Sequence, residues 1–242
     1  GVTWLEFENK FDPDRAKLLG MDTDSALFLQ PECLEDCIDI ILEVLENTPE
    51  RNKLPDDMKH FGNLIIVDSV SQMPSRPELL SKKGMDSNNI GVFQRKMSQA
   101  QRRITNALSK RNVTIMWVNQ TRAKLGFGFG SGGEMTTTYG GNALKFAVAQ
   151  RWNMWSQKKG DNGMLIHFVN QKNNGCGMRP FLKAEAFMSF SKGFDYIDSW
   201  ARAMQSLFIC DRKGQSLIFK EGKFKGSTFT LNKLRDMYGS DP

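Results

Sequence analysis

The chain has 242 residues, of which 40% are hydrophobic and 25% charged, as is usual for a soluble globular protein. No apolar run is long enough for a membrane-spanning helix, and the N-terminus lacks the pattern of a secretory signal, so we expect no membrane partner. Four scattered cysteines (Cys33, Cys37, Cys176 and Cys210) fit neither a disulfide framework nor a zinc site, and we expect them to be reduced in a cytoplasmic compartment.

The net charge of +6 is unevenly distributed along the chain. The window 87–160 contains twelve Lys and Arg residues and a single acidic residue, Glu134, and thus carries +11, whereas the remaining 168 residues sum to −5. Charge segregated in this way favours a polyanionic partner. Nucleic acid is the leading candidate.

Apolar spacing in the first half of the chain predicts strands that alternate with helices. This order is typical of an α/β domain with a largely parallel central sheet flanked by helices. The predicted elements are strands at 3–7, 26–29, 64–67 and 113–118, a helix with an apolar stripe from Leu34 to Leu45, a helix from about 90 to 110, a loop at 48–62 and a polar segment at 71–89.

A glycine-rich stretch, "TRAKLGFGFGSGGEMTTTYGG" at 121–141, shows no pattern of regular structure. A loop of this length inside a compact domain is usually functional or disordered. Beyond it, strands are predicted at 164–169 and 181–188, and a small hairpin at 216–225 precedes a short C-terminal helix.

Polar residues stand where three of the predicted strands end. Glu8 follows the first strand, Asp68 ends the apolar run "LIIVD", and Gln120 follows the strand at 113–118. Alone, Asp68 fits a turn cap as well as a Walker B carboxylate near Mg²⁺. Ligands of open α/β sheets bind beyond the carboxyl ends of the strands, so the three residues could converge on one nucleotide site.

Five motifs, in order, resemble the bacterial and phage RecA recombinases: "LEFENKFDP", "LIIVDSV", "MSQAQRRI", "VNQTRAKLGFGFG" and "TTTYGGNALKF". The resemblance covers roughly residues 3–200 and, more weakly, the tail. It implies a RecA-like P-loop NTPase core at 1–200 and the end of that core, with hairpin and helix, at 201–242. It also implies ATP and Mg²⁺ as cofactors, single- and double-stranded DNA as partners, and self-association into a helical filament.

The resemblance also implies roles for single residues. Glu8 would activate the attacking water, Asp68 would hold Mg²⁺ through water, and Gln120 would sense the terminal phosphate. The residues implied to contact nucleotide are Asp12, Pro13, Arg15 and Ser69 and, towards a neighbouring protomer's nucleotide, Lys145, Phe146 and Lys172. The residues implied to contact DNA are Ile90, Arg95, Arg102, Arg122, Lys124, Leu125, Phe129, Gly140, Gly141 and Asn142, with DNA loops at about 78–90 and 121–141.

The sequence departs from the family pattern at four places. It contains no G-x-x-x-x-G-K-[ST] phosphate loop, which the family places upstream of Glu8, so we expect a truncated core that is inactive alone. Arg15 replaces a tyrosine, Asn170 replaces a lysine, and "NQKNNGCGMRP" is longer than the usual turn. A DNA-binding protein that does not hydrolyse ATP and a hexameric helicase-type motor remain as alternatives.

Overall fold

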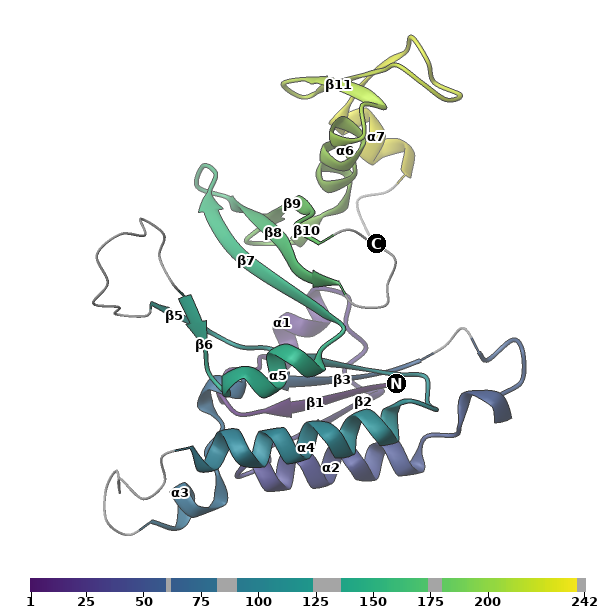
Figure 1. Cartoon of the computed structure of the whole chain (residues 1–242). Coiled ribbons are helices and arrows are strands. Elements are labelled where there is room, and N and C mark those ends of the chain that lie inside the picture. The colour runs from purple at the N-terminus through teal and green to yellow at the C-terminus, as the bar shows by residue number, and fades with distance from the viewer. Residues whose placement is uncertain (60–61, 82–90, 124–135, 174–179, 239–242) are drawn as a thin grey trace. The chain divides into compact units, whose positions relative to one another are not determined.

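The computed structural model describes residues 1–59, 62–81, 91–123, 136–173 and 180–238 (Figure 1). The chain forms two compact units. The first comprises residues 1–14 and 22–148, and the second comprises residues 15–21 and 149–242. The expected division into 1–200 and 201–242 rests on the family resemblance and stays a prediction.

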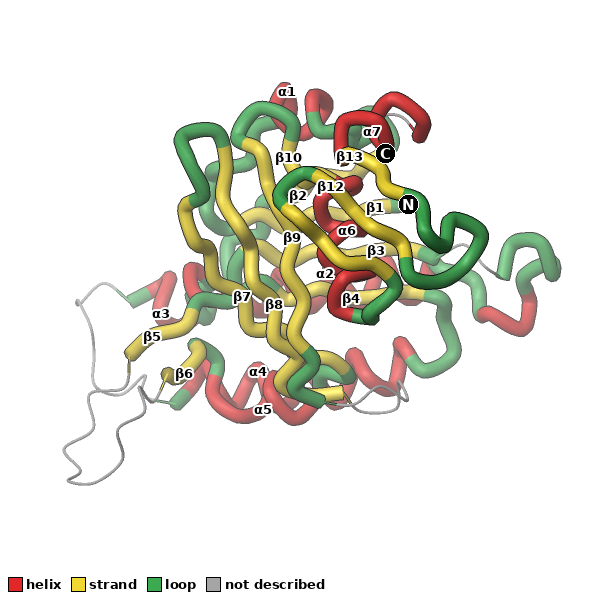
Figure 2. The backbone as a smooth tube through the Cα atoms, turned by 90° about the horizontal axis from the view of Figure 1, so that it is seen from above, coloured by secondary structure: helices red, strands yellow, loops and turns green. Residues whose placement is uncertain are grey.

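The first unit contains a four-stranded sheet in which every neighbouring pair is parallel (Figure 2). Glu6 lies opposite Asp68 in this sheet, which places the carboxyl ends of the two central strands side by side. The predicted α/β fold with a parallel sheet and flanking helices is confirmed. The strand order is β2 (Ala26–Leu29), β1 (Val2–Glu6), β3 (Asn63–Asp68) and β4 (Val113–Trp117).

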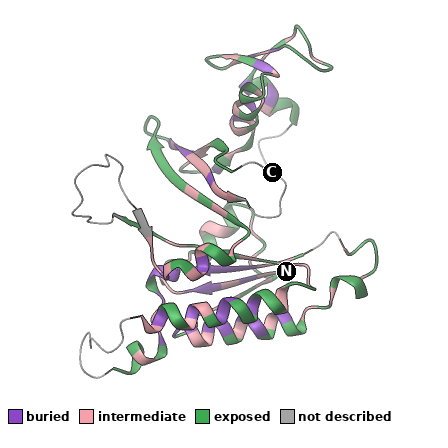
Figure 3. Cartoon of the chain, in the orientation of Figure 1, coloured by how far each residue is buried: buried purple, intermediate pink, exposed green. Residues whose placement is uncertain are grey.

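Two long helices, α2 (Leu34–Asn47) and α4 (Val92–Leu108), lie side by side against one face of this sheet (Figure 1). Their apolar stripes are the buried sides of the helices, while the opposite sides are exposed (Figure 3). Because Leu5, Ile65 and Val67 alternate with residues of the other face, their side chains project into the same core. This core holds the strand ends in fixed register.

The first unit also contains short elements that periodicity did not predict. Ser75 and Glu78 form a capping box at the start of α3 (Arg76–Leu80), inside the polar segment at 71–89, so the loop expected at about 78–90 is helical at its start. The other short elements are α1 (Pro13–Leu18), η1 (Arg51–Lys53), η2 (Val70–Gln72) and α5 (Gly141–Ala147), the last packing against α4 through Leu144.

The prediction that 121–141 lacks regular structure is wrong at both ends of that stretch. Strands β5 (Thr121–Ala123) and β6 (Thr136–Thr138) pair antiparallel, with Arg122 opposite Thr137. Threonine suits strands because of its β-branched side chain, but pairing across such a distance in sequence leaves no local periodic signal. Residues 124–135 lie outside the described part of the chain.

The second unit is built on an antiparallel sheet, in the order β10–β9–β8–β7. A second hydrophobic core, around Leu217 and Leu231, packs a three-stranded sheet with two helices. The elements are β7 (Gln150–Lys158), β8 (Gly163–Asn173), β9 (Lys183–Ser189), β10 (Gly193–Asp195), α6 (Tyr196–Ser206), β11 (Cys210–Lys213), β12 (Ser216–Phe219), β13 (Thr228–Thr230) and α7 (Leu231–Tyr238).

The C-terminal hairpin expected at 216–225 is present as β12 paired with β13, but it extends to Thr230 and β12 is shared with a second hairpin that precedes it. Strand β11 pairs with β12 across a turn at Gly214, whose φ of 60° suits a residue without a side chain. The short C-terminal helix is α7. Within the described ranges, none of the helices has the length and apolar character needed to cross a bilayer.

The α2 core contact should dominate the stability of the first unit. Leu45 is fully buried, whereas Leu27 on the edge strand β2 is 49% exposed. We expect Leu45→Ala to lower the free energy of unfolding by about 3 kcal/mol and the control Leu27→Ala by about 1 kcal/mol or less. Urea titrations followed by circular dichroism measure both values. Equal losses for the two variants would contradict the described core.

Candidate functional site

Side chains from the ends of three neighbouring strands meet at the carboxyl edge of the parallel sheet. Glu8 lies just beyond β1, Ser69 directly follows β3, and Gln120 lies just beyond β4. The Ser69 hydroxyl donates a hydrogen bond to Glu8 Oε1 at 2.6 Å, and Gln120 Nε2 donates to the same oxygen at 3.1 Å. The parallel topology brings these residues together although they are far apart in sequence.

A buried carboxylate shapes the turn that carries Glu8. Glu6 is 6% exposed, and its Oε1 accepts the backbone N–H groups of Glu8 and Lys10, both at 3.1 Å. Its other oxygen accepts the indole N–H of Trp4 at 2.9 Å. Because this one side chain fixes two amides of the turn, Lys10 lies with its Nζ 2.9 Å from Glu8 Oε2.

Sequence reasoning missed Glu6 and Lys10. The available signal was a charged residue at a strand position, "WLEFE", which a buried strand tolerates only when the charge is satisfied. Glu6 meets that condition through its three donors.

The carboxyls of Glu8 and Asp68 have opposite electrostatic environments. The pKa of Glu8 is held below its ordinary value, first by the hydrogen bond from Ser69 and then by the hydrogen bond and positive charge of Lys10. A hydrogen bond from Gln120 adds to this effect. Burial, together with the negative charges of Glu6 and Glu8, raises the pKa of Asp68. Glu8 is thus stabilised as an anion, whereas ionised Asp68 would gain from an additional cation.

The residues present are compatible with a hydrated Mg²⁺ ion. In the described ranges, no group of three or more His, Cys, Asp or Glu side chains is arranged to ligate a metal directly. Magnesium usually keeps several waters and is held by one or two carboxylates together with substrate phosphates. Asp68, with its raised pKa, is a carboxyl of this kind.

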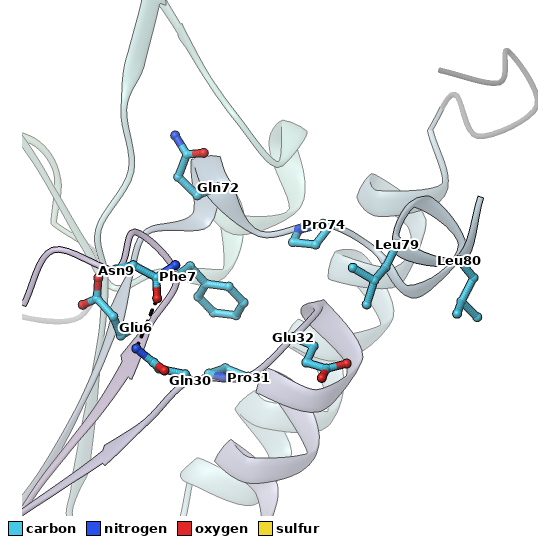
Figure 4. A pocket seen from close by; sticks show the side chains of 10 residues that line it. All are labelled: Glu6, Phe7, Asn9, Gln30, Pro31, Glu32, Gln72, Pro74, Leu79 and Leu80. Carbon is cyan, nitrogen blue, oxygen red and sulfur yellow. Dashed lines mark hydrogen bonds between the residues drawn. The ribbon is translucent and has the colours of Figure 1, made fainter. Parts of the chain in front are cut away.

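A hollow of about 580 Å³ opens beside this site, beyond the ends of β1 and β2 (Figure 4). The Gln30 amide donates to Asn9 Oδ1 at 3.1 Å on one side of it. Phe7 lines it next to the buried Glu6, and Leu79 and Leu80 of α3 line the far side, together with Pro31, Glu32, Gln72 and Pro74.

Most of the other nucleotide-contact candidates lie on exposed or half-buried positions. Asp12 accepts the N–H of Asp14 at 3.0 Å where α1 begins at Pro13, and Arg15 Nη2 donates to the carbonyl of Phe190 at 2.6 Å. Lys145 and the 77% exposed Phe146 lie on α5. Lys172 lies on β8, in the second unit.

The basic candidates for DNA contact lie on the surface of the first unit. Arg95 and Arg102 are exposed on α4, and Arg122 on β5 has its guanidinium 5.9 Å from the centre of the Tyr139 ring. Ile90, Lys124, Leu125 and Phe129 lie outside the described residues.

A glycine pair closes the loop between β6 and α5. Gly140 and Gly141 have φ of 90° and 71°, in the left-handed region that favours glycine. A Cβ on Gly141 would approach Gln94 to 3.0 Å, and Asn142 is exposed in the first turn of α5. Asn119 Nδ2 donates to the Tyr139 carbonyl at 2.9 Å, which ties this end of the loop to the strand end that carries Gln120.

The comparison with known proteins agrees with this fold. A family profile described as the RecA N-terminal domain matches residues 1–195. The chain is 32% identical to Protein RecA of Leptospira meyeri over 199 residues, which are 80% of this chain and 46% of that protein. It is 33% identical to Protein RecA of Sulfurovum sp., over 87% of this chain and 57% of that protein. It is also 33% identical to Protein RecA of Mesomycoplasma hyopneumoniae, over 97% of this chain and 69% of that protein.

The parallel sheet with clustered strand-end residues belongs to the RecA-like class of α/β cores, and the profile covers more than half of the chain. The chain is a member of the RecA family. It spans about half the length of the first relatives that it matches.

The hydrogen bond from Ser69 should control the acidity of Glu8. We expect Ser69→Ala to raise the pKa of Glu8 towards its ordinary value because the shortest hydrogen bond to the carboxylate is lost. Carbon-detected NMR titration of the Glu8 carboxyl measures the shift, with Ser109→Ala on the far end of α4 as the control.

The same substitution should change how stability depends on pH. A folded-state pKa below the unfolded value stabilises the fold above the unfolded pKa, and this stabilisation is lost as the pH falls through the folded pKa. Ser69→Ala should therefore destabilise the chain more at neutral than at acidic pH. An unchanged Glu8 pKa would show that the Ser69 bond does not form in solution.

Proposed function

We propose that this chain is the ATPase core of a RecA-type recombinase, which uses ATP and Mg²⁺, binds single- and double-stranded DNA, and serves homologous recombination and DNA repair in the cytoplasm. The meeting of Glu8, Ser69 and Gln120 at the carboxyl edge of a parallel sheet carries the proposal. In α/β sheets this edge is where nucleotides bind.

Each strand-end residue has a distinct task in the proposed hydrolysis. Glu8, ionised and held by its donors, positions and activates the attacking water. Asp68 holds hydrated Mg²⁺, which neutralises phosphate charge when it is bound. Gln120 bonds Glu8 in this structure and directly precedes β5, so a phosphate that drew its amide away would act on both the base and the glycine-rich loop.

The DNA-binding surface is proposed on the basic window. Arg95, Arg102 and Arg122 are exposed cations that can neutralise phosphates without reading sequence. Lys124 is proposed to act in the same way, Ile90 and Leu125 to wedge between bases, and Gly140, Gly141 and Asn142 to approach the backbone. Phe129, in the same DNA loop, is proposed to couple that loop to the contact between subunits. Such contacts suit a recombinase because base pairing, and not the protein, must select the sequence.

Self-association into a helical filament completes the proposed site. Asp12, Pro13, Arg15 and Ser69 contact the nucleotide of their own protomer, while Lys145, Phe146 and Lys172 reach that of a neighbour. A site shared in this way makes hydrolysis depend on assembly. A DNA-binding protein that does not hydrolyse ATP would need the basic window but not the bonded Glu8–Gln120 pair.

Hydrolysis should require both Glu8 and a phosphate loop. We expect negligible ATPase activity from residues 1–242, which contain no G-x-x-x-x-G-K-[ST] sequence, and DNA-stimulated activity once the chain is extended by the phosphate-loop segment of a RecA relative. In the extended chain, Glu8→Gln should lower kcat about 100-fold or more while nucleotide affinity stays nearly unchanged.

The control for this experiment is Glu46→Gln, an exposed carboxylate on α2. Steady-state ATPase assays and equilibrium binding of a fluorescent ATP analogue separate turnover from affinity. Wild-type kcat in the Glu8→Gln variant would overturn the proposed base.

DNA binding should depend on cations of the basic window. Arg122→Ala should weaken the binding of single-stranded oligonucleotides of every sequence and reduce the salt dependence of log K by about one unit at most, because one phosphate contact is lost. Fluorescence anisotropy at several salt concentrations measures both effects. Arg51→Ala, an exposed arginine outside the window, is the control, and identical curves for the two variants would remove β5 from the DNA surface.

A further inference from the structure

Asn170 in the second unit has a buried side chain of which the oxygen accepts a hydrogen bond but the amide nitrogen donates none among the described residues. It is 1% exposed on β8, and its Nδ2 has no hydrogen-bond partner among the described residues. A buried amide with an unpaired donor destabilises a fold relative to an apolar residue of similar size. An asparagine at this position is therefore explained by what its side-chain oxygen, Oδ1, does.

The side-chain oxygen of Asn170 holds the backbone of Lys172. Asn170 Oδ1 accepts the backbone N–H of Lys172 at 3.0 Å, which is the side-chain-to-backbone bond of an Asx turn placed within a strand. The bond spans a bulge in β8, because Arg151 and Trp152, which are consecutive on β7, face Lys172 and Asn170 and leave Gln171 as the extra residue. A bulge of this kind redirects the side chains beside it.

The backbone of Asn170 is anchored as firmly as its side chain. Its N–H donates to the Leu182 carbonyl at 3.0 Å, and its carbonyl accepts the N–H of Phe181 at 2.6 Å. Phe181 has a φ of 64°, a conformation that β-sheet residues seldom adopt. The backbone of Asn170 is therefore held in place by the two residues directly before β9, and its side chain in turn holds the backbone amide of Lys172.

We propose that Asn170 is a positioning residue for Lys172: its side-chain carbonyl fixes the β8 backbone across the bulge at Gln171 and so directs the lysine side chain. The proposal rests on the proposed function in one respect, that Lys172 contacts the nucleotide of a neighbouring protomer. Asn170 itself touches no nucleotide, because its side chain is buried.

The first test uses residues 1–242 as they are. Asn170→Leu removes the acceptor at similar volume, while Asn170→Thr keeps a weaker acceptor without burying a charge. The Lys172 amide should exchange with deuterium about tenfold faster in Asn170→Leu than in the wild type, with Asn170→Thr between them. NMR-detected exchange measures this, Asn162→Leu on an exposed turn is the matched control, and unchanged protection in Asn170→Leu would overturn the proposal.

The second test uses the chain extended by a phosphate-loop segment and measures hydrolysis against protein concentration. Asn170→Leu should shift this dependence in the direction of Lys172→Ala, Asn170→Thr should partly restore it, and the Asn170→Leu/Lys172→Ala double variant should be no worse than Lys172→Ala alone. A general loss of structure would instead add to the effect of Lys172→Ala and would lower the melting temperature in proportion.

The outcomes separate the two proposals. If Lys172→Ala impairs hydrolysis and Asn170→Leu does not, or if their effects add, the positioning role is overturned while the shared site stands. If Lys172→Ala itself has no effect, the shared site fails, and the role of Asn170 in the reaction fails with it, whereas the exchange data still establish the turn.

Discussion

The carboxylate of Glu8 is the point on which the site in the first unit depends. It accepts hydrogen bonds from Ser69 directly after β3, from Gln120 beyond the end of β4 and from Lys10 in the turn after β1. These donors keep the pKa of Glu8 low, while burial and the neighbouring negative charges raise that of Asp68. Two carboxyls with opposite environments can perform different tasks, one as a base and the other near a cation.

The fold explains how this arrangement is maintained. Parallel pairing aligns the strands so that their carboxyl ends share one edge, and the apolar sides of helices α2 and α4 pack against one face of the sheet. The buried carboxylate of Glu6 then fixes the turn that carries Glu8 and Lys10. From the same edge the chain runs through Gln120 directly into β5, at the start of the glycine-rich stretch. The residues proposed to contact nucleotide and those proposed to contact DNA are therefore adjacent in the covalent chain.

What the sequence could predict followed from periodicity and from strand-end chemistry. The apolar run before Asp68 and the stripes of α2 and α4 identified the parallel core, because burial imposes a period on the residues. The Ser75–Glu78 capping box of α3 is present in the sequence as a motif, but the polar composition around it gives α3 no periodic signal. No local sequence pattern predicts the pairing of β5 with β6 or the hydrogen bond from the Lys172 amide to Asn170, because both depend on how the strands pair. Lys10 was likewise unpredictable, since its place depends on the buried Glu6.

The central claim is that Glu8 and Ser69 act as one hydrogen-bonded unit across the β1 and β3 strand ends. A double-mutant cycle of Glu8→Ala and Ser69→Ala in residues 1–242, measured by urea unfolding at neutral pH, tests this most directly. A bonded pair should give a coupling free energy of about 0.5–3 kcal/mol, with the double variant less destabilised than the sum of the single variants. Additivity of the two substitutions to within a few tenths of a kcal/mol would contradict it.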